Sequence, residues 1–307
     1  MEVEKELANI APQGETLLTI GVFDGVHAGH RYLLEKLKQR SAEKNLLSGV
    51  VTFNPHPQSV LYPCNQLPGL SNLEDRVRAF QELGIKIVAV LTFTAQVAQL
   101  SARDFMSLVK KQLRMRGIMV GPDFALGLNR EGNIDLLRAM GREMEFSVEV
   151  IPSYIINGEV VSSTLIRRVL AQGDMRKVEG LMGRYFQLVG KVITSDKRGR
   201  ILGFPTANLD IKPQQALPGN GIYATIAQVD GEQFYSATNI GIRPTFGEGE
   251  KTVETHLLNY KGDLYGKDMR LEFVQKLRDE QRFLSSEELK AQIERDVREV
   301  ETILAKD

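Results

Sequence analysis

The sequence predicts an α/β plus β protein with two domains: an N-terminal Rossmann-like domain with a parallel sheet, and a C-terminal antiparallel β-barrel with a closing helix. Three observations support this prediction. The 307 residues are about twice the length of a typical domain. The first part of the chain alternates apolar runs with helix-spaced segments, and the second part contains short strands separated by turn residues. We expect the domains at 1–184 and 185–307.

In the first domain, strands are predicted where apolar residues form continuous runs, and helices where they recur every three or four positions. The predicted strands are Leu17–Phe23, Gly49–Phe53, Ile85–Leu91 and Ile118–Gly121, and the predicted helices are His30–Lys44, Asn72–Leu83, Ala102–Met115 and Asn133–Met144. This alternation is typical of a parallel sheet covered by helices on both faces. Ligands of such sheets bind at the carboxyl ends of the strands, so we expect a site in the loops after Phe23, Phe53 and Gly121.

In the second domain, short strands lie between clusters of Gly, Asp, Asn and Pro. The predicted strands are Gln187–Thr194, Gly221–Val229, Gln233–Asn239, Thr252–Leu258 and Met269–Val274. Regular short strands favour an antiparallel barrel or sandwich. A final helix follows an N-cap at Ser285 or Ser286, and its apolar stripe consists of Leu289, Ile293, Val297, Val300 and Leu304.

The composition excludes several classes of protein. Basic and acidic side chains are equal in number, at 39 each, whereas nucleic-acid-binding proteins usually carry a basic excess. The single cysteine, Cys64, cannot form an internal disulfide or a cysteine zinc site. No apolar run is long enough to span a membrane, and Met1–Ala8 does not resemble a signal peptide. We expect a soluble cytoplasmic protein that binds neither nucleic acid nor membrane.

The first motif is Gly21-Val-Phe-Asp-Gly-Val-His-Ala-Gly-His30, between a predicted strand and a predicted helix. Its glycines allow the backbone to approach a ligand, and free amides at a helix start favour an anion. His27 and His30 are three residues apart, so both imidazoles can reach one point, as is suitable for holding triphosphate oxygens. The alternative is an ordinary turn with surface or metal-binding histidines. With only four histidines and no cysteine partners, metal is disfavoured.

Two further segments have polar residues near predicted loops. In Thr52–Pro57, two prolines form a rigid turn that could hold Asn54 and His56 over the first loop. In Ser162–Arg167, Ser163 and Thr164 are suited to a helix start, and Arg167 on the first turn could bind pyrophosphate with two hydrogen bonds. Taken alone, the first segment is an ordinary proline turn and the second an ordinary helix cap.

The second domain has a basic, glycine-rich segment, Lys197–Asn208. Thr206 and Asn208 offer neutral oxygens two residues apart, which suits a Mg²⁺ ion that keeps several waters and binds nucleotide phosphates. Further along, Glu254 lies within a strand-like run and could be a general base that activates a hydroxyl. The alternatives are a solvated surface hairpin and a glutamate on the solvent face of a strand.

The motifs of the first domain resemble those of nucleotidyltransferases. Gly21–His30 is similar to the GxFDGxHxGH form of their His-x-Gly-His signature, and Ser162–Arg167 to their later Ser-Ser-Thr-x-x-Arg segment. Gly121–Gly127 resembles a segment of the flavin-specific branch, with Leu126 in place of an aromatic residue. The resemblance implies an FMN adenylyltransferase in which His27, His30 and Arg167 are catalytic. It also implies that FMN and ATP are bound by Gly21, Phe23, Gly25, Asn54, Asp123, Ser163 and Thr164.

The second domain resembles riboflavin kinases. The matching segments are Gly203–Asn208, Gly221–Tyr223, Asn239–Gly247 and Asp263–Lys267. The resemblance implies that Thr206 and Asn208 bind Mg²⁺ and ATP, and that Glu254 takes the proton from the riboflavin 5′-hydroxyl. It implies nucleotide or flavin binding by Gly203, Pro205 and Arg243. Thr255 replaces a residue that is usually apolar in the family.

The order of the two resemblances is that of bacterial bifunctional riboflavin kinase/FAD synthetases. It implies phosphorylation of riboflavin to FMN and then adenylylation of FMN to FAD, with ATP as co-substrate in both steps. Two alternatives stay open: an enzyme in which only one domain is active, and a flavin-binding regulator without turnover. The sequence leaves open the oligomeric state, transfer of FMN between domains, flavin inhibition, the preferred flavin redox state, and the effect of Leu126 or Thr255 on activity.

Overall fold

The computed structural model describes residues 1–64, 67–194, 203–212, 214–243 and 250–305. The chain divides into two compact units, Met1–Ser163 and Thr164–Asp307. The predicted domain boundary after residue 184 lies beyond two helices that this division groups with the second unit, α8 (Ser163–Gln172) and α9 (Met175–Met182). That boundary stays a prediction.

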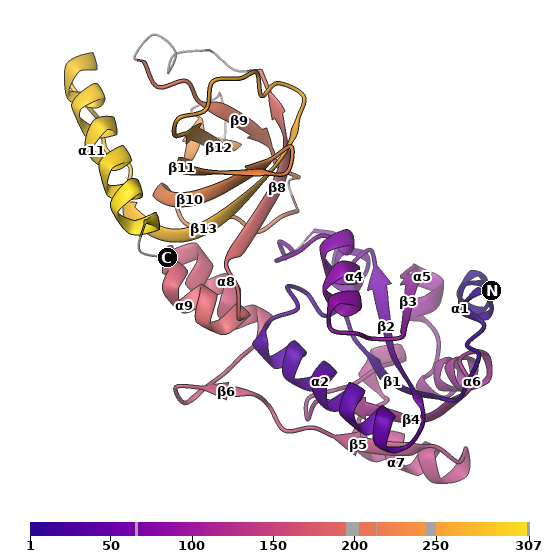
Figure 1. Ribbon diagram of the computed structural model, residues 1–307. Coiled ribbons are helices and arrows are strands. Elements are labelled where there is room, and N and C mark those ends of the chain that lie inside the picture. The colour runs from indigo at the N-terminus through magenta and orange to yellow at the C-terminus, as the bar shows by residue number, and fades with distance from the viewer. Residues whose placement is uncertain (65–66, 195–202, 213, 244–249, 306–307) are drawn as a thin grey trace. The chain divides into compact units, whose positions relative to one another are not determined.

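The first unit contains a five-stranded parallel sheet in the order β3-β2-β1-β4-β5 (Figure 1). Its strands are β1 (Thr16–Ile20), β2 (Leu47–Asn54), β3 (Ile87–Thr92), β4 (Met115–Val120) and β5 (Ser147–Val150). The parallel sheet and four of these strands confirm the prediction, and β5 was not predicted. β1 ends earlier than expected, at Ile20, because the following residues form a turn.

Helices cover both faces of this sheet. The α-helices before β5 are α1 (Glu2–Ile10), α2 (Ala28–Glu43), α3 (Pro57–Leu61), α4 (Leu73–Glu82), α5 (Ala95–Ala98), α6 (Ala102–Gln112) and α7 (Ile134–Glu143). The core divides accordingly: Leu18 and Ile20 of β1 belong to the cluster that includes α1, α6 and α7, whereas Leu17 belongs to the cluster that includes α2 and α4. The predicted helix from Ala102 to Met115 was too long, because Arg114 has a left-handed φ of 50° and Met115 begins β4.

The second unit contains a closed antiparallel barrel in the order β10-β11-β12-β9-β8-β13. Its strands are β8 (Phe186–Ile193), β9 (Ala207–Asp210), β10 (Gly221–Val229), β11 (Glu232–Arg243), β12 (Glu250–Leu257) and β13 (Asp268–Arg278). The barrel confirms the prediction for five of these strands, whereas β9 was expected to be a turn. A short two-stranded hairpin, β6 (Ile155–Ile156) with β7 (Glu159–Val160), belongs to the first unit.

Four hydroxyl side chains are completely buried inside the barrel: Thr225, Ser236, Thr238 and Thr255. The Thr225 hydroxyl lies 2.7 Å from that of Ser236 and 2.6 Å from that of Thr238, and the Thr238 hydroxyl donates to that of Thr255 at 2.9 Å. We call these four residues the hydroxyl ladder. Because these hydroxyls are hydrogen-bonded to one another, none of them is left unpaired by burial in the barrel interior.

The closing helix, α11 (Ser286–Leu304), packs on the outside of the barrel. Ser285 is its N-cap and accepts a hydrogen bond from the Glu288 amide at 3.2 Å, as predicted. Val300 and Leu304 are buried against β10, and Asp296 accepts hydrogen bonds at 2.7 and 2.9 Å from the Arg278 guanidinium of β13.

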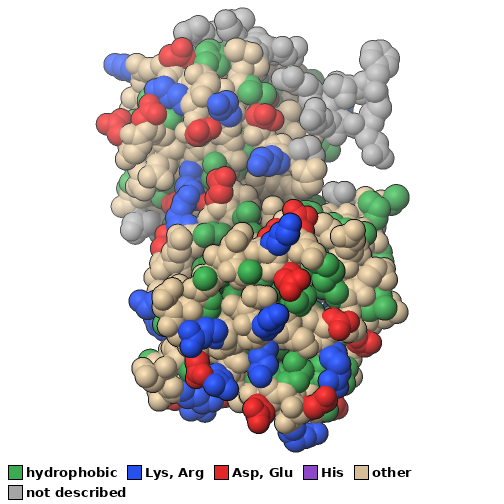
Figure 2. Space-filling view, turned by 90° about the vertical axis from the view of Figure 1, so that its right-hand side faces the viewer, with side chains coloured by type: hydrophobic (Ala, Val, Ile, Leu, Met, Phe, Trp, Pro, Cys, Tyr) green, Lys and Arg blue, Asp and Glu red, His purple; other side chains and the backbone are tan. Residues whose placement is uncertain are grey.

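Side chains of both charges are intermixed on the face that Figure 2 shows.

Candidate active sites

The topology of the first unit places one site at the carboxyl end of β1. This strand lies between β2 and β4, so the chain leaves β1 on one side of the sheet and returns on the other. In parallel sheets, such a switch of direction separates the flanking loops and opens a crevice for ligands. The Gly21–His30 and Gly121–Gly127 motifs form the loops after β1 and β4, so both motifs lie at this crevice.

The loop after β1 has an unusual backbone. Phe23, Gly25 and Val26 have positive φ values of 55°, 81° and 38°. Such angles are uncommon for residues with a side chain and rare for a β-branched one, so the loop is held by its surroundings. A Cβ at Gly25 would lie 3.0 Å from the Cβ of Leu70, which accounts for the glycine.

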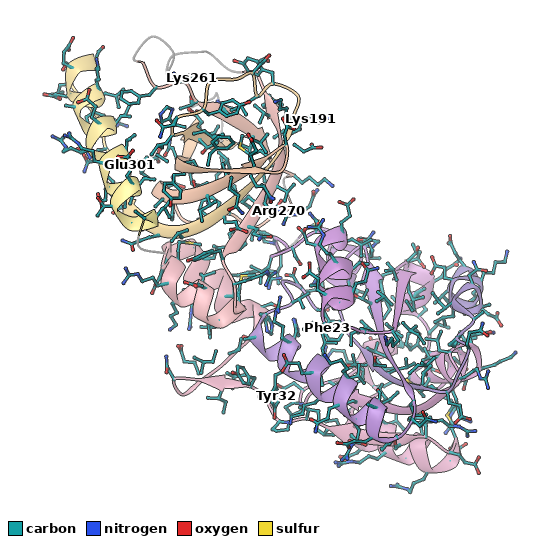
Figure 3. All side chains as sticks on the ribbon, in the orientation of Figure 1. Phe23, Tyr32, Lys191, Lys261, Arg270 and Glu301 are labelled. Carbon is teal, nitrogen blue, oxygen red and sulfur yellow. The ribbon has the colours of Figure 1, made fainter. Side chains whose placement is uncertain are left out.

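The two histidines of the motif meet at the start of α2. His27 is the N-cap, and its Nδ1 accepts a hydrogen bond from the His30 amide at 3.3 Å. The rings are stacked with centroids 3.6 Å apart, and the ring of Phe23 contacts that of His30 edge-on at 5.2 Å. Figure 3 labels Phe23 in this loop. A Cβ at Gly29 would lie 3.3 Å from the His27 ring, so a glycine there leaves room for the stack.

Burial, and secondly the proximity of His27, lowers the pKa of His30 well below 6.5. His30 is therefore uncharged at neutral pH. Its Nδ1 is buried and has no hydrogen-bond partner among the described residues. A buried nitrogen in this state is available to a ligand oxygen or hydroxyl.

A buried carboxylate and a buried guanidinium hold this loop, and neither residue was predicted to belong to the site. Asp24 is 5% exposed and accepts hydrogen bonds from the amides of Leu70, at 2.9 Å, and Ser71, at 3.2 Å. Arg76 on α4 is also 5% exposed and donates to the carbonyls of Val22, at 2.6 Å, and Phe53. Burial lowers the pKa of Arg76, and Asp24 opposes this effect. The pair connects the loops after β1 and β2. Asp24 was visible within the motif, but Arg76 had no signal in the sequence.

Ser163 lies with this loop, since its hydroxyl donates to the Asp24 carbonyl at 3.0 Å. Thr164 and Arg167 belong to the second unit, so their relation to the histidines stays a prediction. The expectation that Arg167 lies on the first helical turn was wrong. Because α8 begins at Ser163, Arg167 lies on the second turn.

The other predicted residues of this site are at the neighbouring strand ends. Asn54 is the last residue of β2 and is exposed. His56 is the N-cap of α3, and its Nδ1 accepts from the Gln58 amide at 3.1 Å. Asp123 is exposed in the turn after β4. Leu126 is partly buried and packs against the hydrophobic core.

In the barrel, three polar residues lie side by side on adjacent strands. Asn239 of β11 pairs with Glu254 of β12, which pairs with Asn208 of β9. Directly paired residues point to the same face, with Cβ atoms about 5 Å apart. Thr206 lies two residues before Asn208, which favours the same face. Thr206, Asn208 and Glu254 therefore form a common candidate site.

Two observations refine this site. Asn239 was not predicted to be a site residue, yet its Oδ1 is buried without a hydrogen-bond partner among the described residues. Thr255 points away from the site, because its side chain belongs to the hydroxyl ladder inside the barrel. The polar replacement beside Glu254 is thus satisfied on the opposite face of the strand.

The remaining predicted residues of the barrel site lie at the edge of the described segments. Gly203 and Pro205 are exposed in the segment before β9, and Gly203 has a φ of 86°. Arg243 ends β11, and its side chain is outside the described residues, as are residues 195–202 and 244–249 of the predicted loops. Within the described residues, no group of three or more His, Cys, Asp or Glu side chains could hold a metal ion. In the same part of the chain, no helix is long and apolar enough to cross a membrane.

The chain combines a parallel-sheet unit, of the kind that binds ligands at its strand ends, with an antiparallel barrel. Comparison with known proteins matches both parts of the chain to described families. Residues 9–165 match the family model of FAD synthetase and residues 182–304 that of riboflavin kinase. The chain is 39% identical to the bifunctional riboflavin kinase/FMN adenylyltransferase of Escherichia coli K12, over 93% of this chain and 92% of that protein. It is 37% identical to the protein of the same description from Pseudomonas fluorescens, over 97% and 96%.

The chain belongs to the family of bifunctional riboflavin kinase/FMN adenylyltransferases. It is a transferase with one domain for each step of FAD synthesis, and both kinds of domain use ATP. The chain is also similar to the crystal structure of a macrolide-efflux protein from Streptococcus pneumoniae, with a TM-score of 0.87 and 24% identity, over 97% of this chain and 96% of that one. That likeness concerns the fold.

Proposed function

We propose that the loop after β1 catalyses the transfer of AMP from ATP to FMN. An FMN phosphate oxygen attacks the α-phosphorus of ATP, and the bond to pyrophosphate breaks. Enzymes of this chemistry position the reactants and stabilise the charge that develops on the phosphate oxygens. The stacked pair His27–His30 at the start of α2 is the observation that carries this proposal. Neutral imidazoles donate hydrogen bonds to phosphate oxygens, and the helix amides add to the attraction.

In this proposal the remaining residues bind the reactants. Arg167 carries charge opposite to that of the leaving pyrophosphate. Gly21 and Gly25 let the backbone approach the nucleotide, and Phe23 supports the His30 ring. Asn54, Asp123, Ser163 and Thr164 are assigned to the binding of FMN and ATP.

For the barrel, we propose that Glu254 accepts the proton of the riboflavin 5′-hydroxyl. The freed oxygen attacks the γ-phosphorus of ATP, and ADP leaves. Thr206 and Asn208 bind the ATP phosphates beside the base, with Gly203, Pro205 and Arg243 completing the nucleotide and flavin sites. The register that places Asn208 directly opposite Glu254 supports this assignment.

The oxygens of Thr206 and Asn208 suit Mg²⁺. This ion takes one or two protein ligands, several waters and nucleotide phosphates, so it needs no cluster of carboxylates. When bound, Mg²⁺ would neutralise charge on the transferred phosphoryl group. The chain's own residues orient the nucleotide and remove the proton. We expect the reactions to take place in the cytoplasm.

The test is a time course with riboflavin, ATP and MgCl₂, in which flavins are separated by chromatography. We expect FMN first and FAD later. Glu254→Gln should abolish FMN formation while FAD formation from added FMN continues. Glu232→Gln, on an exposed position of β11, is the matched control and should retain both steps.

The alternatives predict other results. FMN formation without FAD would leave a chain with one active domain. Riboflavin binding without either product would identify a flavin-binding regulator. If the Glu254→Gln variant forms FMN at the original rate, Glu254 is not the base.

A further inference from the structure

The segment that leads into β9 is held to the barrel by a histidine. The Nδ1 of His256 lies 2.8 Å from the carbonyl oxygen of Pro205, immediately before Thr206. The ring of Phe204 contacts the His256 ring edge-on, with centroids 5.4 Å apart and planes at 80°. His256 thus contacts two consecutive residues of a segment that precedes the strand ladder.

The backbone pairing of β9 with its neighbouring strands does not include Thr206. β9 pairs with β12 through only two residue pairs, Ala207 with Thr255 and Asn208 with Glu254. Its pairing with β8 begins at Asn208. Pro205 has no amide hydrogen to contribute. The carbonyl of Pro205 is a backbone group immediately before Thr206, and His256 binds it.

The chemistry of this contact determines which ring nitrogen of His256 is the donor. A carbonyl oxygen only accepts hydrogen bonds, so the Nδ1 of His256 must carry the proton. In the neutral ring, Nε2 is then an acceptor. Both the Nδ1–H tautomer and the imidazolium can make the bond.

Strand β12 connects this anchor with the base. His256 lies two residues after Glu254, and residues at this spacing point to the same face of a strand. One strand therefore carries both the group that accepts the proton and the group that holds the segment of Thr206. A displacement of this segment would change the position of Thr206 relative to Glu254.

We propose that His256 is a positioning residue of the riboflavin kinase site, which acts through the Pro205 carbonyl to hold Thr206 in place for ATP. This inference rests on the role of Thr206 in the proposed function. In this proposal the side chain acts through Pro205 and Phe204 rather than on a reactant. Its loss should weaken the use of ATP more than the binding of riboflavin.

The experiment compares His256→Ala with His256→Asn in the full-length protein. The asparagine amide nitrogen occupies nearly the place of Nδ1 and can donate to the same carbonyl, whereas alanine cannot. For His256→Ala we expect the KM for ATP in the kinase step to rise by about tenfold, the effect of losing one well-formed hydrogen bond. His256→Asn should recover most of this loss. Riboflavin affinity, measured by flavin fluorescence, and FAD formation from added FMN should stay unchanged.

The controls distinguish the role of Thr206 from that of His256. If Thr206→Val leaves ATP use unaffected, the assignment of Thr206 in the proposed function is wrong. If Thr206→Val impairs ATP use but His256→Ala does not, only the inference about His256 is overturned. Equal impairment of His256→Ala and His256→Asn also overturns it, because the aromatic ring rather than the donor would then be required. Phe204→Leu measures that contribution of the ring contact directly.

Discussion

Replacement of Asp24 by asparagine tests how the loop after β1 is held. The change keeps the size of the side chain but replaces a charged acceptor by an amide. The Asp24 carboxylate accepts from the Leu70 amide at 2.9 Å and from the Ser71 amide at 3.2 Å. Both amides donate to Oδ1, and the Leu70 amide also lies 3.1 Å from Oδ2. An asparagine with its oxygen in the place of Oδ1 keeps a neutral acceptor for both amides, but the Leu70 amide then also faces an NH₂ group. Arg76 would also lose a neighbouring negative charge.

The expected cost follows from these contacts. A hydrogen bond to a charged group contributes about 1.5–3 kcal/mol, more than a neutral one, and Asp24 is 5% exposed, so water replaces little of the loss. A neutral hydrogen bond contributes about 1 kcal/mol less, so weakening both bonds costs about 2–3 kcal/mol in local stability. Since about 1.4 kcal/mol corresponds to a factor of ten, the equilibrium constant for opening of the loop should rise at least about 30-fold.

Hydrogen–deuterium exchange with mass spectrometry measures this opening. We expect peptides that cover residues 21–30 and 68–72 to exchange at least about 30-fold faster in Asp24→Asn, while the barrel strands are unchanged. FAD formation from FMN should fall by about tenfold or more, because the histidines lose their support. FMN formation from riboflavin should continue at its original rate.

The matched control is Asp135→Asn on α7, whose side chain is 93% exposed. This variant should exchange and react like the original protein. Unchanged exchange of the loop in Asp24→Asn would refute the reasoning from buried hydrogen bonds. Equal loss of both enzymatic steps would show that the effect is global and not confined to the first site.

Three further predictions concern other parts of the chain. Burial, and secondly His27, lowers the pKa of His30 in the folded state. The unfolded chain therefore binds more protons than the folded chain below about pH 6.5. The free energy of unfolding should consequently fall with decreasing pH, by up to about 1.4 kcal/mol per pH unit. His30→Asn should flatten this slope in urea titrations, and an unchanged slope would contradict the assignment. Asp296→Ala removes a buried carboxylate from the partly buried Arg278 guanidinium and should cost about 3 kcal/mol, measured as faster exchange of α11. Unchanged protection of α11 would show that the pair does not stabilise the helix. Gly127→Ala places a Cβ 2.5 Å from the Ala102 nitrogen at a φ of 78°, so FAD formation from FMN should fall while FMN formation persists, and full activity would show that this loop adapts.

The sequence predicted those parts of the fold that depend on local periodicity. The first four strands of the parallel sheet and the five long strands of the barrel have runs of apolar or alternating residues, and each lies within a few residues of its expected position. β5 and β9 were missed because they are four residues long. β9 also begins only two residues after Pro205, and its strand character comes from pairing with distant segments.

The same distinction applies to the sites. The histidines could be placed together because they are three residues apart at a helix start, and the structure stacks their rings. Arg76, by contrast, looks like a surface residue of an amphipathic helix in the sequence. Its burial depends on carbonyls 54 and 23 residues away, which no local pattern reveals. The buried Oδ1 of Asn239 depends in the same way on the folded barrel.

The hydroxyl ladder has a consequence for the register of the barrel strands. Successive residues of a strand point to opposite faces, so a slip of one residue along β12 would exchange the positions of Thr255 and Glu254. The Thr238 hydroxyl would lose its partner, and a carboxylate would enter the closed interior, where a charge is costly. The ladder therefore penalises the misaligned pairings of β11 and β12, and the inner face of the barrel selects the alignment in which the outer face carries its glutamate.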